Sequence, residues 1–435
     1  MEKELVIRDI DLPKKFELLY ERKVYVYGAG FWGEKTCRKL KEIGVAVAGL
    51  VDRREVLHGT LLWGSKVYSP DELAQISQED EGIIIIISTN QYADEIVSTI
   101  IEKRIECGNV FTVLGLDYAI YFNLNRLENK ILKRYQQRYL VWKYNNEIEM
   151  LKKQAVLQVT PFMEGDADII VHQPGKVGSN TISTTLRHHV IPAVRTHGIL
   201  YSCEYANGGD ELKNTMVDAI YSEDRKVKLI TLVRDPIAKD IGHFFQKLTA
   251  TENDTAWFVK GLMEKDFQQS YLNYLSVVSP FDFSNGKRKD EFNKKMVSHI
   301  DYIGSKNSNG ALWGWYEEEY KNILGIDVLA HEFDVDKGYT VIRHKNVEVL
   351  IMQLEKLNTL ENVLAEFVDV PELKLVSVNR GVEKAYRYIY KAFQKEVRIP
   401  KEYMEFCYNN PYMRHFYSKE DIERFYKKWE DKIIK

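Results

Sequence analysis

The residues best suited to chemistry lie between Asp168 and Leu186, where an apolar strand, a glycine turn and a helix start follow one another. Small hydroxyl and amide residues are preferred at helix N-termini. Unpaired backbone N–H groups and the helix dipole at such a turn attract anions, and a lysine in the turn adds positive charge. The sequence therefore predicts a nucleotide-phosphate site. Its expected residues are Lys176, Gly178, Ser179, Asn180 and Thr181.

A second anion-binding element is predicted at Arg234-Asp235-Pro236. The apolar stretch 226–233 before it is typical of a buried strand. Asp235 is a good helix cap and Pro236 a good first helical residue. Arg234 would then stand at the carboxyl end of a strand, where open α/β sheets bind phosphates. The alternative is an arginine that forms a salt bridge with a neighbouring helix.

The spacing around the lysine departs from the commonest nucleotide-binding loop. The P-loop of ATP- and GTP-binding proteins needs a glycine five positions before the glycine of its Gly-Lys pair, and a Ser or Thr after the lysine. Ile170 and Val177 occupy those positions here. A kinase or nucleotidyl transferase that uses this loop is therefore disfavoured, and no residue pattern predicts a metal site.

Together, the two elements resemble the sulfotransferases that use 3′-phosphoadenylyl sulfate. In that family a Pro-Lys-x-Gly-(Ser/Thr) loop holds the 5′-phosphosulfate, and an Arg-(Asp/Asn)-Pro segment, with a serine eight positions on, holds the 3′-phosphate. The resemblance implies that Lys176 and Arg234 hold these groups here. Two positions depart from the family pattern. Gly175 separates Pro174 from the lysine, and Gly242 replaces the serine, which permits close backbone approach or weakens the grip on the 3′-phosphate.

The same resemblance implies a base that removes the proton of an acceptor hydroxyl. Thr196-His197 follows a short apolar run that predicts a strand, and it is similar to the Thr-His segment of cytosolic sulfotransferases. His197 is the expected base, with Glu204 as second candidate because other branches use a glutamate from this region. A histidine with a structural role at a strand end is the alternative. Lys176 is expected to stabilise the leaving phosphate.

A closer resemblance covers about residues 168 to 430. It is to a bacterial family of capsular polysaccharide synthesis proteins, a branch of the same superfamily. The segments that carry it begin at Trp315, Leu324, Phe333, Leu354 and Arg414. The resemblance implies a glycan-modifying role with a glycan or sugar-nucleotide acceptor.

Another glycine turn lies near the N-terminus, where a strand from Lys23 runs into Gly28-x-Gly30-x-x-Gly33. A helix, a second strand over 45–51 and Asp52 complete a βαβ dinucleotide pattern, in which the acid binds ribose hydroxyls. This region resembles Rossmann-like modules attached to bacterial glycosyltransferases and sugar-modifying enzymes. The resemblance implies a second nucleotide or nucleotide-sugar. The alternative is that the glycines only pack a helix on a strand.

The elements that must position these residues give an α/β fold. We expect a Rossmann-like half-domain over 1–117, a helical connector over 118–160, and a P-loop-like, sulfotransferase-type three-layer α/β domain over 161–435. The connector is long enough to bridge the domains or to form a homo-oligomer. Helices predicted over 347–357, 382–395 and 419–432 complete the last domain.

Composition limits the remaining classes. The chain has 435 residues and a formal net charge of −3, which gives no sign of a nucleic-acid surface. Its four cysteines are scattered, so neither a zinc site nor a disulfide framework is predicted. The N-terminus lacks a signal-peptide pattern, and the longest apolar run, 83–87, is too short to span a membrane. These features predict a cytoplasmic protein.

The predicted reaction is therefore transfer of a sulfuryl group from 3′-phosphoadenylyl sulfate to a hydroxyl of a sugar or of a capsular or exopolysaccharide precursor. A non-catalytic nucleotide-binding scaffold is an alternative, motivated by Gly242. An NAD-dependent sugar dehydrogenase is another, but it needs a Tyr-x-x-x-Lys or equivalent that has no place beside the first domain.

Overall fold

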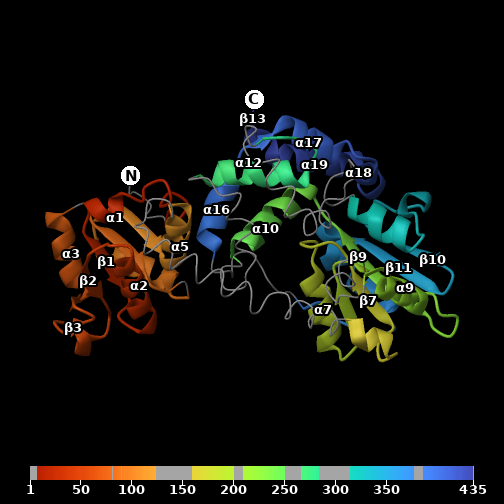
Figure 1. Cartoon of the computed structure of the whole chain (residues 1–435), viewed down its shortest axis with the longest axis horizontal. Coiled ribbons are helices and arrows are strands. Elements are labelled where there is room, and N and C mark those ends of the chain that lie inside the picture. Colours follow the sequence, from red (N-terminus) through yellow and green to blue (C-terminus); the bar gives the residue numbers. More distant parts are fainter. Residues whose placement is uncertain are drawn as a thin grey trace. The chain divides into compact units, whose positions relative to one another are not determined.

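The structure is a computed structural model that describes residues 7–80, 82–89, 91–123, 159–199, 209–249, 266–283, 314–376 and 386–434. The chain divides into two compact units, each with one larger sheet (Figure 1). The first unit comprises Met1–Leu140, Met263–Ser270 and Gly381–Val397, and the second comprises Val141–Leu262, Tyr271–Arg380 and Arg398–Lys435. Most of the expected connector, 124–158, lies outside the described residues, so the boundaries at 117 and 160 stay a prediction.

The first unit is built on a six-stranded sheet with the order β3-β4-β2-β1-β5-β6. Neighbouring strands pair in parallel, except for the antiparallel pair of β3 and β4. The strands are β1 (Val24–Tyr27), β2 (Val47–Val51), β3 (Leu61–Leu62), β4 (Ser65–Tyr68), β5 (Ile84–Ile87) and β6 (Asn109–Thr112). Its helices are α1 (Leu18–Glu21), α2 (Phe31–Glu42), α3 (Pro70–Glu79), α4 (Ala93–Glu102), α5 (Val113–Phe122) and α16 (Arg387–Glu396).

Burial on both faces explains the uninterrupted apolar strands of this sheet. In β1, Val24 and Val26 belong to one hydrophobic cluster, whereas Tyr25 and Tyr27 belong to the other. The four isoleucines of β5 divide between the two clusters in the same way and are fully buried. A parallel strand covered by helices on both sides needs no polar face.

The second unit is built on a five-stranded sheet with the order β10-β11-β9-β7-β8. The four strands β11, β9, β7 and β8 are parallel, and β10 is an antiparallel edge strand. The strands are β7 (Ile169–His172), β8 (Ala193–Thr196), β9 (Val227–Val233), β10 (Tyr339–His344) and β11 (Val347–Gln353). Helix α7 (Ser179–His188) joins β7 to β8, α9 (Gly209–Ile220) precedes β9, and α10 (Pro236–Thr249) follows it.

The later helices of the chain complete the description. Helix α12 (Phe267–Val278) runs from the first unit into the second, and a π-helical segment covers Tyr316–Ile323. The second unit also contains α15 (Glu361–Phe367), α17 (Lys401–Tyr408), α18 (Pro411–Phe416) and α19 (Lys419–Trp429). Strands β12 (Ile399–Pro400) and β13 (Ile433–Ile434) form a small parallel pair.

The helix predicted over 347–357 is wrong. Residues 347–353 form strand β11, and a 3₁₀ turn over Leu354–Thr359 follows. The strand lies between β9 and β10, and Val349 to Gln353 are all buried. A central strand buried on both faces has a continuous apolar sequence, which periodicity alone does not separate from a buried helix. The other two predicted helices correspond to α16, which begins at Arg387, and to α19.

The expected α/β class is confirmed, because both units contain a mostly parallel sheet accompanied by helices. The more specific Rossmann-like and sulfotransferase-type assignments stay predictions. What matters for the site is that β7, β8, β9 and β11 all point in one direction. The segments that follow their carboxyl ends therefore lie along one edge of the second sheet.

Candidate functional site at the carboxyl edge of the second sheet

The turn after β7 has the backbone of an anion-binding loop. Lys176 and Gly178 both adopt the left-handed conformation, with φ of 70° and 108°. A side-chain carbon at Gly178 would also lie only 2.7 Å from Cδ1 of Leu354, so both conformation and space favour glycine. Helix α7 then begins, and the N–H groups of its first turn lie beside the loop.

The cap of α7 differs from the expectation. Ser179, Asn180 and Thr181 are the residues predicted to cap the helix, but the N-cap residue is Gly178, and no side chain forms a cap hydrogen bond. The N–H of Thr181 donates to the carbonyl oxygen of Gly178 at 3.0 Å. The glycine takes the cap because the turn needs its positive φ. The three small residues instead form the first helical turn, where their backbone N–H groups remain next to the loop.

Arg234 lies against this loop. Its Nη1 donates a hydrogen bond of 2.8 Å to the carbonyl oxygen of Lys176. A side-chain carbon built on Gly242, in helix α10, would lie 3.8 Å from that Nη1 and 4.0 Å from Cδ of Lys176. The structure thus brings three predicted residues together from two separate segments, the loop after β7 and the stretch that leads from β9 into α10. Within the described part of the chain, no carboxylate forms an ion pair with Arg234.

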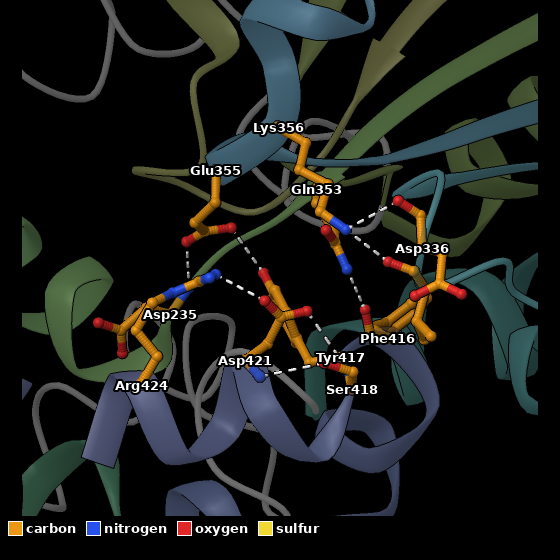
Figure 2. Close-up of polar contacts among 11 residues, drawn as sticks. Asp235, Asp336, Gln353, Glu355, Lys356, Phe416, Tyr417, Ser418, Asp421 and Arg424 are labelled. Carbon is orange, nitrogen blue, oxygen red and sulfur yellow. Dashed lines mark hydrogen bonds and ion pairs between the residues drawn. The ribbon is translucent and has the colours of Figure 1, made fainter. Parts of the chain in front are cut away.

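The segment that carries Arg234 is anchored by the carboxylates of Asp235, which is buried, and Glu355. Asp235 accepts from the N–H of Ile237 at 3.1 Å and thereby caps α10, as predicted. The N–H of Asp235 donates to Glu355 Oε1 at 2.8 Å, and the hydroxyl of Tyr417 donates to Glu355 Oε2 at 2.9 Å (Figure 2). Burial, together with the charge of Asp235, raises the pKa of Glu355. These contacts hold the backbone beside Arg234 in place.

Residues of helices α17 and α19 donate hydrogen bonds to the carboxylate of Asp235. Asp235 also accepts hydrogen bonds from the hydroxyl of Tyr408 at 2.9 Å and from Nε1 of Trp429 at 3.1 Å. Lys428 Nζ lies 3.4 Å from its Oδ2. The side chain of Asp235 is therefore satisfied entirely by structural partners. Of the neighbours Arg234 and Asp235, it is the side chain of Arg234 that contacts the loop.

His197 directly follows β8, whose last residue, Thr196, ends at the same edge of the sheet. Its Nδ1 lies 3.0 Å from the carbonyl oxygen of Gln173. A carbonyl oxygen can only accept, so Nδ1 carries the hydrogen and the neutral ring has its lone pair on Nε2. Trp315 Nε1 donates to the carbonyl oxygen of His197 at 2.7 Å. These two hydrogen bonds fix the ring and the backbone of His197.

A buried cluster behind the loop is not predicted from the sequence. His172 packs against the rings of Trp315 and Tyr320, with ring centroids 4.9 Å and 5.3 Å away. Its Nε2 lies 3.4 Å from Oε2 of Glu319, and this carboxylate also accepts from the N–H of Ile199 at 2.8 Å. The cluster ties the end of β7 and the segment after His197 to the π-helical segment.

Gln173 is the second feature that sequence reasoning misses. Its side chain is fully buried, and among the described residues neither its amide oxygen nor its amide nitrogen has a hydrogen-bond partner. An unpaired buried amide costs free energy, so such a group in a native site needs a reason. No sequence signal marks this glutamine, apart from its position directly before Pro174 in the turn.

The N-terminal glycine turn is closely packed. Gly28 has a φ of 104°, and its N–H donates to the carbonyl oxygen of Val51 at 2.7 Å. A side-chain carbon on Gly33 would lie 2.0 Å from the carbonyl oxygen of Gly28, so this glycine lets α2 pack on the turn. Gly30 has open space, since a side-chain carbon there would meet nothing closer than Arg54 Nη2 at 4.0 Å.

The carboxylate of Asp52 accepts hydrogen bonds from nearby residues of the first unit. Its Oδ2 accepts from the N–H of Ala29 at 2.8 Å and from Arg54 Nη2 at 3.0 Å. Its Oδ1 accepts from the N–H and from Nε of Arg54, at 3.0 and 2.9 Å. Burial raises the pKa of Asp52, but the hydrogen bonds from Arg54 and Ala29 outweigh it, and the net shift is downward. A ribose would have to displace Arg54 to reach this carboxylate.

Glu204, the second candidate base, lies outside the described residues, which resume at 209. Its position relative to His197 stays a prediction. In the part of the chain that the structure describes, no helix has the length and apolar character needed to cross a membrane.

Comparison with known proteins adds one finding. Residues 287–418 match the family NKWYS, described as “Putative capsular polysaccharide synthesis protein”. The matched segment contains Trp315, Glu319 and Glu355, which support the site, but not Lys176, His197 or Arg234. No curated protein matches the chain. No solved structure matches it either. The match links this part of the chain to capsular polysaccharide synthesis.

Proposed function

We propose that this protein is a sulfotransferase that moves the sulfuryl group of 3′-phosphoadenylyl sulfate to a hydroxyl of a sugar or of a capsular or exopolysaccharide precursor. The observation that carries the proposal is the meeting of Lys176, Arg234 and Gly242 at one sheet edge, with His197 following the neighbouring strand. The family match of residues 287–418 supports a glycan as acceptor.

The donor would be held through its charged groups. Lys176 and the N–H groups at the start of α7 are suited to the 5′-phosphosulfate, because they combine a cation with a helix N-terminus. Arg234 is suited to the 3′-phosphate, since it forms no ion pair among the described residues and lies beside Gly242, the position of the serine in the sulfotransferase pattern. A hydrogen-bonding group of the donor would also give the buried amide of Gln173 a partner.

In the proposed reaction the acceptor oxygen attacks sulfur and a new S–O bond forms. His197 Nε2 takes the proton of the hydroxyl, and the bond from sulfur to the bridging phosphate oxygen breaks. The products are the sulfate ester, protonated His197 and 3′,5′-adenosine bisphosphate. Lys176 and the backbone donors of α7 stabilise the negative charge that develops on the leaving phosphate.

A titration tests the donor site. Isothermal titration calorimetry with 3′,5′-adenosine bisphosphate, and with ATP and NAD for comparison, is carried out on the wild type and on Lys176→Ala and Arg234→Ala. We expect binding of the bisphosphate in preference to ATP and NAD, weakened at least tenfold by each substitution. Arg343→Ala is the matched control, because Arg343 is an exposed arginine on β10 paired with Glu348. Absence of bisphosphate binding to the wild type overturns the proposal.

A second assay separates an enzyme from a scaffold. A non-catalytic nucleotide-binding scaffold is the other function to consider, because Gly242 lacks the hydroxyl that the sulfotransferase pattern has at this position. Transfer of radiolabelled sulfate from the donor to capsular glycan fractions is measured for the wild type and for His197→Ala. Transfer that His197→Ala abolishes, with bisphosphate affinity retained, supports catalysis. Binding without transfer favours the scaffold.

A further inference from the structure

A cavity of 510 Å³ lies beside the edge strand of the second sheet. Its walls come from helix α7, from the turn after it and from strand β8. Neither Lys176, His197 nor Arg234 lines it, so it has no part in the donor site described above. Its volume is in the range of pockets that hold small ligands.

Two arginines give the cavity its charge. Arg187 comes from α7 and Arg195 from β8. Both arginines line the same cavity. Burial lowers the pKa of Arg195, and the positive charge of Arg187 lowers it further. Across the described residues, neither arginine forms an ion pair with a carboxylate. Like charges held together without a counter-ion favour binding of an anion.

The remaining lining combines a hydrogen-bonding group with an apolar surface. The hydroxyl oxygen of Ser183 is buried and has no hydrogen-bond partner among the described residues. Leu186, Val190 and Pro192 supply the apolar part of the wall. A ligand that fits this lining carries an oxyanion for the arginines, a further polar group for Ser183, and a less polar ring face for the apolar residues.

The cavity is connected to both parts of the candidate site. Arg195 donates a hydrogen bond to Oδ1 of Asn180, which belongs to the first turn of α7 beside the donor loop. Arg195 also precedes His197 by two residues on the same strand and its extension. A ligand held by Arg195 is therefore adjacent to the elements that carry the donor loop and the expected base.

We propose that this cavity binds the acidic group of one sugar residue of the acceptor glycan, and thereby selects acidic polysaccharides. The inference rests on the proposed function for its choice of a glycan. The shared ligand chemistry is an oxyanion on a sugar ring, which either a uronic acid carboxylate or an existing sulfate ester supplies. Arg187 and Arg195 bind the oxyanion, and Ser183 donates to a ring hydroxyl or to the same oxyanion.

Binding is tested without any donor nucleotide. Three oligosaccharides of equal length are titrated into the full chain: one of alternating glucuronic acid and N-acetylglucosamine, its sulfated derivative, and its carboxyl-reduced neutral derivative. We expect at least one acidic oligosaccharide to bind ten or more times more tightly than the neutral one, and this preference to fall as salt rises. Comparison of the two acidic probes shows whether carboxylate or sulfate is preferred.

Substitutions locate the binding. Arg187→Gln and Arg195→Gln are each expected to weaken binding of the acidic oligosaccharide about tenfold, the effect of losing one charge-assisted hydrogen bond. Arg195→Lys keeps the charge but loses the planar guanidinium group. Its affinity for the acidic oligosaccharide should lie between those of the wild type and Arg195→Gln. Arg343→Gln serves as the matched control, and the circular dichroism spectrum of each variant checks its fold.

Three results would overturn the inference: equal affinity for acidic and neutral probes, wild-type affinity in both glutamine variants, or equally tight binding of inorganic sulfate alone. The donor titration keeps this test separate from the proposed function. If the acidic probe binds through the arginines but 3′,5′-adenosine bisphosphate does not bind, the sulfotransferase proposal fails and the cavity assignment stands. If the bisphosphate binds and the arginines have no effect, only the cavity assignment fails.

Discussion

The glycine turns after β1 and after β7 share a backbone design but differ in which of their groups are satisfied. Both follow a buried parallel strand, both contain a glycine in the left-handed conformation, Gly28 at φ 104° and Gly178 at φ 108°, and both lead into a helix. Beside the first turn, both carboxylate oxygens of Asp52 accept hydrogen bonds, from Ala29 in the turn and from Arg54.

The second turn differs in the partners of Arg234 and Gln173. Arg234 contacts a carbonyl oxygen and forms no ion pair among the described residues, and the buried amide of Gln173 has no partner there. A local motif therefore does not define a binding site by itself. What distinguishes the two turns is whether nearby charged and polar groups are already satisfied within the fold.

The largest expected difference between the turns concerns charge. Lys176→Ala should lower sulfuryl transfer by about 100- to 1,000-fold, because it removes one fixed donor from the developing charge on the leaving phosphate. Lys35→Ala removes a lysine from the first turns of α2, where it lies over the rings of Phe31 and Trp32, and should leave transfer unchanged. Steady-state assays of both variants test this. Equal losses in both variants would show that the two turns do not differ in this way.

Packing provides the next contrast. Gly33→Ala would place a carbon 2.0 Å from a backbone oxygen and should destabilise the protein by about 1–3 kcal/mol. Gly242→Ala meets nothing closer than 3.8 Å and lies inside a helix, so it should stabilise by about 0.5–1 kcal/mol. Thermal unfolding followed by circular dichroism should give shifts of opposite sign. Shifts of the same sign would show that the space at these glycines does not decide their roles.

Gly242→Ser tests the role of the position beside Arg234. A hydroxyl there restores a hydrogen-bond donor, and one net hydrogen bond is worth about 0.5–1.5 kcal/mol. Affinity for 3′,5′-adenosine bisphosphate should therefore rise about threefold to tenfold, while affinity for ATP stays the same. Calorimetry with both nucleotides measures the effect, with Gly242→Ala as control for the helix. An unchanged or equal response to both nucleotides would place the 3′-phosphate elsewhere.

The smallest expected effect is the loss of stability on replacing Asp52, whose carboxylate is hydrogen-bonded by Ala29 and Arg54. The pKa of Asp52 is lowered in the folded protein, so its contribution to stability is present above its unfolded pKa of about 3.9 and is lost as the pH falls through the lowered value. Asp52→Asn should destabilise by about 1 kcal/mol at pH 7. Urea unfolding should show a larger difference between the wild type and Asp52→Asn at pH 7 than at pH 3. Glu95→Gln, which breaks an exposed pair with Arg53, is the control.

Sequence reasoning succeeds where one segment determines the outcome. The buried strand before Arg234 and the cap formed by Asp235 depend on residues within a few positions of each other. Strand β11 is mistaken for a helix because its apolar run fits both structures until the neighbouring strands are known. The preference for Gly178 over Ser179 as cap depends on backbone conformation, which residue types indicate only in part.

The supporting residues could not be predicted, because their roles depend on distant partners. Glu355 has ordinary neighbours in the sequence, and its function arises only where β11 ends beside Asp235 and Tyr417. Glu319 likewise acquires its role where the π-helical segment meets His172 and Ile199. The roles of such residues can be recognised only in a three-dimensional structure, whereas glycines and lysines in turns can be recognised from their residue type.

The hydrogen bond from Trp429 to Asp235 has a consequence for biosynthesis. The two residues are separated by 194 positions, and the indole belongs to α19. The ribosome must therefore synthesise the chain through α19 before the carboxylate of Asp235 can have all of its hydrogen-bond partners. The hydrogen-bond network around Asp235 is therefore completed only after α19 has been synthesised and has docked.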